Sequence, residues 1–149
     1  MSGFIATSPA ATQTVITNDG FFPDIDLRHL RTAMRLDGTV TSERLEAAAI
    51  AAILSVNADL APLRADTGTL DDIPWPSING ESALLHLYRR AVYALTAAEL
   101  HERYRNYDST GQGTAHADEL SPGIDELKRD ARFAIRDMLR HVRTTVELI

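Results

Sequence analysis

The side chains of this sequence that could do chemistry are five histidines, scattered acids and a row of arginines between residues 129 and 143. The histidines do not have the spacing of metal ligands. His101 and Glu102 are adjacent, but the second histidine of a zinc-binding HExxH motif is absent. The segment STGQGTAH (109–116) lacks the Gly-Lys-Ser/Thr ending of a phosphate-binding loop, and no serine has the context of a nucleophile elbow. We therefore expect no catalytic residue, no metal site and no cofactor, and a protein that is not an enzyme.

The strongest chemical pattern is the arginine row itself, which consists of Arg129, Arg132, Arg136, Arg140 and Arg143. On a helix that turns about 100° per residue, all five fall within a sector of about 80°, nearly opposite the apolar residues of the same segment. Three interpretations remain open. The row is a solvated face partly neutralised by Asp130, Asp137 and neighbouring helices, a strip that docks on an acidic surface of a second subunit, or a strip that binds DNA.

The charge balance of the whole chain makes DNA binding the least favoured of the three interpretations. The chain has 149 residues and a net charge of −6. Residues 83–107 carry four arginines and two acids, and residues 127–149 carry six bases and three acids, so these two segments are together +5 and the rest of the chain is −11. A chain with such separated charges can meet a copy of itself, or a charged partner, in a preferred orientation.

The elements that must position these residues are helices. Periodic apolar residues and capping signals predict four of them, from Asp24 or Asp26 to Met34, from Ser42 to Leu60, from Glu81 to Tyr107, and from Asp118 or Pro122 to Arg140. A loop with two prolines around the only tryptophan separates the second helix from the third. No segment alternates as a strand does. We expect an all-α protein, an adaptor-like four-helix bundle with long loops.

The two ends of the chain lack helical periodicity. Residues 1–20 are rich in small and polar side chains, and we expect an extended N-terminal arm there, a helical domain over residues 21–142, and a C-terminal tail over residues 143–149. The stretch NDGFFPDIDL (18–27) is interpreted as the hinge of the arm. On that interpretation Phe22 packs on the core of its own subunit, Phe21 lies nearer the surface, and residues 1–17 touch an adjacent subunit.

The absence of cysteine excludes disulfides and thiolate metal sites. The first residues lack the charged and apolar regions of a signal peptide, and no run is long enough to cross a membrane. These features fit an intracellular product.

Four segments of the sequence resemble one known family. They are residues 18–48 (NDGFFPDIDLRHLRTAMRLDGTVTSERLEAA), the end of the Ala-rich helix at 55–57 (SVN), residues 84–111 (LLHLYRRAVYALTAAELHERYRNYDSTG) and residues 128–140 (KRDARFAIRDMLR). The chain is similar in these segments to the head completion protein L family of contractile-tailed temperate phages of the peduovirus type. The pieces MRLDGTVT and KRDARFAIRD are the most specific, although neither is a catalytic signature.

The resemblance implies a virion part of the neck that is made in the host cytoplasm. Such a protein joins the portal protein after DNA packaging as a ring, probably dodecameric like the portal, stabilises the DNA-filled head, and offers a docking surface to the next neck or tail-completion protein. DNA would pass through the ring without sequence-specific binding.

The candidate site residues follow from this resemblance together with the arginine row. For contact between subunits they are Arg129, Arg132, Arg136, Arg140, Phe21 and Trp75. For binding to the portal they are Arg143, Val146, Leu148 and Ile149. A small acidic helical module for regulation or dimerisation is the alternative to this whole interpretation, and for Phe21 and Trp75 the alternative is a role in covering the ends of the bundle.

Overall fold

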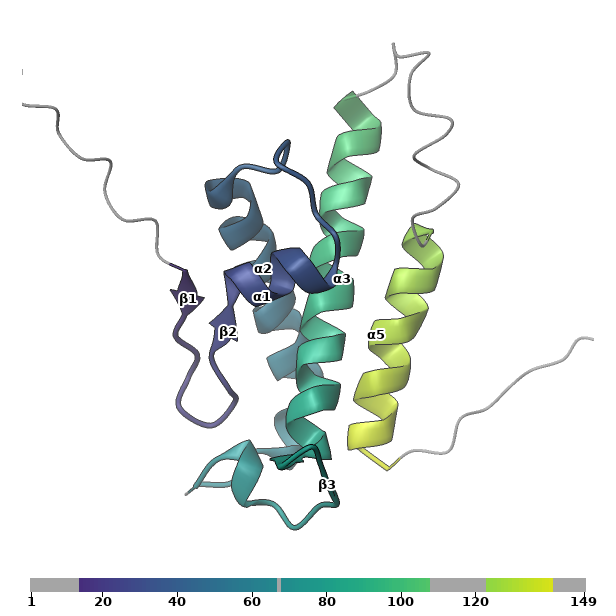
Figure 1. Ribbon diagram of the computed structural model, residues 1–149. Coiled ribbons are helices and arrows are strands. Elements are labelled where there is room, and N and C mark those ends of the chain that lie inside the picture. The colour runs from purple at the N-terminus through teal and green to yellow at the C-terminus, as the bar shows by residue number, and fades with distance from the viewer. Residues whose placement is uncertain (1–13, 67, 108–122, 141–149) are drawn as a thin grey trace, which may run out of the picture.

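The fold was analysed in a computed structural model that describes residues 14–66, 68–107 and 123–140 (Figure 1). Within these residues there are four α-helices: α1 (Leu27–Ala33), α2 (Ser42–Asp59), α3 (Ala83–Tyr107) and α5 (Ile124–Met138). Two antiparallel ladders accompany them, in which β1 (Val15–Ile16) pairs with β2 (Ile25–Asp26) and β3 (Ser77–Ile78) pairs with β4 (Glu81–Ser82). The expected all-α bundle is therefore confirmed, and the ladders are too short to give a strand pattern in the sequence.

Helix α3 is the central element of the bundle. It packs against α2 on one side and α5 on another, and the three helices run alternately up and down (Figure 1). The buried stripe of α2 includes Leu45, Ala49, Ala52 and Val56, and its alanines let α3 approach closely. The short helix α1 and the β1–β2 ladder cover this pair of helices (Figure 1).

The MRLDGTVT segment is the loop that joins α1 to α2. The guanidinium of Arg31 donates to the carbonyl oxygens of Asp37 and Val40, each at 2.9 Å, and the Asp37 carboxylate accepts the backbone N–H of Thr39 at 2.9 Å. Thr41 then caps α2 by accepting the N–H of Arg44 at 3.3 Å. One of the two most family-specific pieces of the sequence thus has a structural task, which is to hold the loop between α1 and α2 in one conformation.

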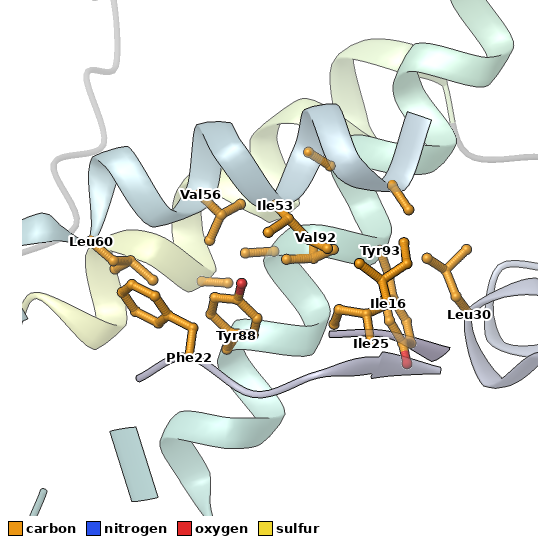
Figure 2. Packing of buried hydrophobic residues seen from close by; sticks show 14 of the residues in the cluster. Ile16, Phe22, Ile25, Leu30, Ile53, Val56, Leu60, Tyr88, Val92 and Tyr93 are labelled. Atoms are coloured by element: carbon orange, nitrogen blue, oxygen red, sulfur yellow. The ribbon is translucent and has the colours of Figure 1, made fainter. Parts of the chain in front are cut away.

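Both phenylalanines of the NDGFFPDIDL stretch are buried. Figure 2 shows Phe22 beside Tyr88 of α3, where the two rings stack with centroids 5.3 Å apart, and Phe21 meets Phe22 edge to face at 5.0 Å. Phe21 is only 5% exposed, so the expectation that it lies nearer the surface is wrong. The reason is a tight turn, in which Gly20 takes a φ of 88° and one Asp19 carboxylate oxygen accepts the N–H groups of both Phe21 and Phe22 at 3.0 Å.

A closed ring of three hydrogen bonds joins the N-terminal segment to α2 and α3. The Tyr88 hydroxyl donates to Asn57 Oδ1 at 2.7 Å, the Asn57 amide donates to Asn18 Oδ1 at 2.9 Å, and the Asn18 amide donates to the Tyr88 hydroxyl at 2.7 Å. The Asn18 amide also donates to the carbonyl of Pro23 at 3.0 Å. Each side-chain group in the ring is therefore satisfied, as burial requires.

Residues 14–20 belong to the bundle rather than to an arm. Ile16 is 9% exposed and pairs with Ile25, and the N–H of Leu27 donates to the carbonyl of Thr14 at 2.8 Å. The arm expected over residues 1–20 therefore does not include this stretch. Residues 1–13 and the expected tail at 143–149 lie outside the described residues.

We predict that Tyr88→Phe lowers the free energy of unfolding by about 1–3 kcal/mol. The ring of the side chain is kept, but Asn57 Oδ1 and the Asn18 amide lose their buried partner. Urea unfolding followed by circular dichroism measures the change. Tyr93→Phe is the control, because its hydroxyl contacts His29, which is exposed and can turn to water. An equal loss of stability in both variants would contradict the special role of the hydrogen bonds that join Asn18, Asn57 and Tyr88.

The second prediction concerns pH and Asp19. Partial burial tends to raise the pKa of this carboxyl, but the N–H groups of Phe22 and Phe21 together with the Arg64 guanidinium outweigh it and hold the pKa below the usual 3.8. A lowered folded pKa contributes stability above pH 3.8 that is lost as the pH falls through the folded value. We expect Asp19→Asn to be less stable than the parent protein at pH 7 in urea unfolding, and the gap to narrow as the pH falls below 3.8 and through the folded pKa of Asp19. A gap that stays constant with pH would contradict this.

Candidate functional site

Helix α5 is the element that carries the candidate site. Its inner side consists of Leu127, Ala131, Ala134 and Met138, all buried. Two ion pairs also tie it to α3, Lys128 Nζ to Glu102 at 2.6 Å and Arg90 to Asp130 at 3.5 Å. Buried residues along its length and ion pairs to α3 fix the rotation of α5, so the side opposite α3 points outward in a defined way.

The outward side of α5 carries Arg129, Arg132 and Arg136. Arg129 and Arg132 are exposed and Arg136 is half-buried, and none of the three forms an ion pair with another described residue. Asp130, which was expected to help neutralise the row, pairs with Arg90 instead. Like charges three and four residues apart on a helix destabilise it by roughly 0.2–0.5 kcal/mol per pair. The subunit therefore holds a rigid row of positive charge that an acidic partner would stabilise.

An open depression of about 480 Å³ lies beside this row. Its lining residues are Asp59, Arg129, Arg132, Phe133, Ile135 and Arg136. Asp59 is the last residue of α2, so the depression lies between the end of α2 and the outer side of α5. Three guanidiniums at the edge of a partly apolar hollow suit a ligand that combines carboxylates with apolar side chains.

Arg140 leaves the row and stacks on Trp75. Helix α5 ends at Met138, and Arg140 takes a left-handed backbone conformation with a φ of 56°. Its guanidinium carbon lies 4.3 Å from the centre of the Trp75 ring, a cation–π distance. The structure thus brings together, within one subunit, two residues that the sequence placed at an interface between subunits. Arg143 and the other expected portal-binding residues, Val146, Leu148 and Ile149, lie outside the described residues.

Phe21 was also expected at the interface between subunits. Because it is buried under its own Asp19 turn, it has almost no surface to offer a neighbour. The sequence reasoning in turn missed exposed apolar residues on α2, where Leu54 is 66% and Ile50 is 41% exposed. A signal for them existed, since Ile50 and Leu54 are four residues apart and lie off the apolar stripe formed by Leu45, Ala49, Ala52 and Val56.

The chemistry available in the described part of the chain is hydrogen bonding and charge pairing. There, no three His, Cys, Asp or Glu side chains come close enough together to hold a metal ion, and no helix is long and apolar enough to span a membrane. His29 Nδ1 lies 2.7 Å from the Tyr93 hydroxyl, and burial raises the pKa of Tyr93 to about 12. Burial likewise raises the pKa of Tyr88. Both hydroxyls therefore stay protonated at neutral pH and serve the packing of the bundle.

Fold and site together define a helical protein whose distinguishing surface is a row of charges, and comparison with known proteins gives its family. The profile of the family described as phage head completion protein (GPL) matches residues 16–149. The head completion/stabilization protein of Escherichia phage P2 is 40% identical over 136 residues, covering 88% of this chain and 80% of that protein. The probable head completion/stabilization protein of Haemophilus phage HP1 is 35% identical over 136 residues, covering 82% of this chain and 91% of that protein. No solved structure matches.

The chain therefore belongs to the phage head completion protein family, as its resemblance to that family indicated. Membership makes it a structural protein of the phage head, associated with the virion.

We predict that the double variant Arg132→Glu/Arg136→Glu keeps its stability as an isolated subunit, within about 0.5 kcal/mol, because neither arginine pairs with another described residue. Thermal unfolding followed by circular dichroism tests this. Arg89→Gln is the control, since Arg89 makes two hydrogen bonds of 2.7 and 2.9 Å to Glu81 and its loss should lower the melting temperature. A large loss in the double variant would mean that the row stabilises its own subunit.

Proposed function

We propose that this protein completes phage heads as a ring, dodecameric like the portal, that binds the portal vertex after DNA packaging. The ring stabilises the DNA-filled head and provides the docking surface for the next neck or tail-completion protein. The observation that carries the proposal is the outward arginine row of α5, whose Arg129, Arg132 and Arg136 form no ion pair with another described residue of their own subunit. In a member of the head completion family, that row is best used between subunits.

A ring follows from the distribution of charge. The chain is −6 overall, yet α5 presents arginines in a row, so the acidic excess lies elsewhere on the subunit. A contact between two different faces of identical subunits repeats from copy to copy and closes into a ring when the rotation allows it. The portal would act as the template for closure, and the isolated protein would be a monomer or a weak oligomer.

Residues 143–149 are proposed as the clip that binds the portal protein. Val146, Leu148 and Ile149 would fill apolar pockets, and Arg143 would make a charged contact at the base of the clip. The stack of Arg140 on Trp75 supports this role, because it holds the end of the described chain, three residues before position 143, against the bundle.

The protein would act without catalysis and without a cofactor, at the neck of the virion after synthesis in the host cytoplasm. Packaged DNA would pass through the lumen of the ring without sequence-specific binding. The net negative charge suits such a passage, because a wall that is not strongly basic does not retain the phosphate backbone.

Purified DNA-filled heads that lack this protein provide the test. We expect the parent protein to make them resistant to nuclease and able to accept tails, and the variant Arg132→Glu/Arg136→Glu to do neither. Deletion of residues 143–149 should leave a folded protein, judged by circular dichroism, that no longer joins heads.

Light scattering after size exclusion, with and without portal protein, gives a second readout. A ring should form only when portal is present. A stable dimer that does not change when portal protein is added would favour a regulatory or dimerisation module. Normal completion of heads by the truncated protein would show that residues 143–149 are not needed to bind the portal.

A further inference from the structure

Helix α2 has an outward face that no described part of the chain covers. Ile50 is 41% and Leu54 is 66% exposed, and Ala47 beside them is exposed as well. At about 100° per residue, Glu43, Ile50 and Leu54 fall within about 40° of one another on the helix. The stripe is thus apolar in its middle and acidic at its N-terminal end, where Glu46 stands one turn after Glu43.

The acids of this face match the arginines of α5. Neither Glu43 nor Glu46 forms an ion pair with another described residue, just as Arg132 and Arg136 form none. The two glutamates are separated by a rise of about 4.5 Å along α2, and the two arginines by about 6 Å along α5. Two carboxylates and two guanidiniums at such similar separations can pair one to one when the helices lie side by side.

The apolar parts of the two surfaces match too. The arginine row borders a depression of about 480 Å³ whose lining includes the half-buried Phe133 and the edge of the buried Ile135, and the α2 face offers Ile50 and Leu54 as projecting side chains. Arginine stems are themselves apolar and cover such side chains well. Exclusion of water by the apolar contact would strengthen the ion pairs next to it, since charge-assisted hydrogen bonds gain in a less polar setting.

Within one copy, no ion pair joins Glu43 or Glu46 to Arg132 or Arg136. The opposite side of α2, with Leu45 and Val56, is buried in the core against α3, and α5 packs on another side of α3 (Figure 1). We infer that the outward face of α2 in one copy docks on the arginine row of α5 in the next. This deepens the proposed function and rests on it, because it names the face that the row binds.

The test uses charge reversal on each side. The first variant is Glu43→Arg/Glu46→Arg in α2, and the second is Arg132→Glu/Arg136→Glu in α5. We expect neither variant alone to complete DNA-filled heads, because each presents like charges at every contact. An equal mixture should restore completion, because alternating copies around a ring bring opposite charges together at every contact.

Asp66→Arg/Asp71→Arg is the matched control. It makes the same change in net charge at exposed acids away from α2, and it should complete heads alone as the parent protein does. Circular dichroism checks that all three variants fold, and Leu54→Arg provides an independent block of the α2 face if the double glutamate variant unfolds.

The outcomes separate this inference from the proposed function. If both α2 variants complete heads as well as the parent, or if both reversed proteins fail and their mixture fails too, the α2 face is not the partner of the row while the ring proposal stands. If the parent protein itself does not complete heads, the proposed function fails. If the α5 variant instead loses salt-dependent binding to duplex DNA and no α2 variant rescues it, the row binds DNA and the inference is overturned.

Discussion

The structure depends on the closed ring of hydrogen bonds among Asn18, Asn57 and Tyr88. These side chains come from the N-terminal segment, α2 and α3, so a single, partly buried network joins three separate parts of the chain. Phe22 stacks on Tyr88 and helps to shield the network from water. Hydrogen bonds in such a setting are costly to leave unmade, and the network therefore favours one arrangement of the segments over the many that apolar packing alone would allow.

Helix α5 depends on this frame through α3. Its buried stripe and its two ion pairs to α3 fix its rotation, and the outward arginines become a rigid row rather than a set of independent charges. Because the helix fixes where the arginines emerge, binding of a partner costs only their side-chain freedom and no rearrangement of the backbone, which suits a protein that acts by assembly. The stability of the subunit and the function of its surface are then largely separate, since Arg129, Arg132 and Arg136 form no ion pair with another described residue.

The helices themselves could be predicted from the sequence. The expected limits of the second helix, Ser42 to Leu60, agree with α2 within one residue, because a long amphipathic pattern and a capping threonine are local signals. The burial of Phe21 and the packing of residues 14–20 could not be predicted, because both depend on a turn made by Asp19 and on two-residue pairing with β2. Pairing over two residues leaves too little periodicity to recognise.

For the candidate site, the sequence by itself determined that arginines recur at helical spacing opposite an apolar stripe, since one helix suffices to define a face. Only the tertiary structure decided which of these arginines remain without an ion pair or a ring contact. Asp130 pairs with Arg90 across two helices, Arg140 turns onto Trp75, and Leu54 of α2 remains uncovered. Each of these outcomes depends on residues far apart in the chain, and their distance in space is set by packing rather than by spacing along the sequence.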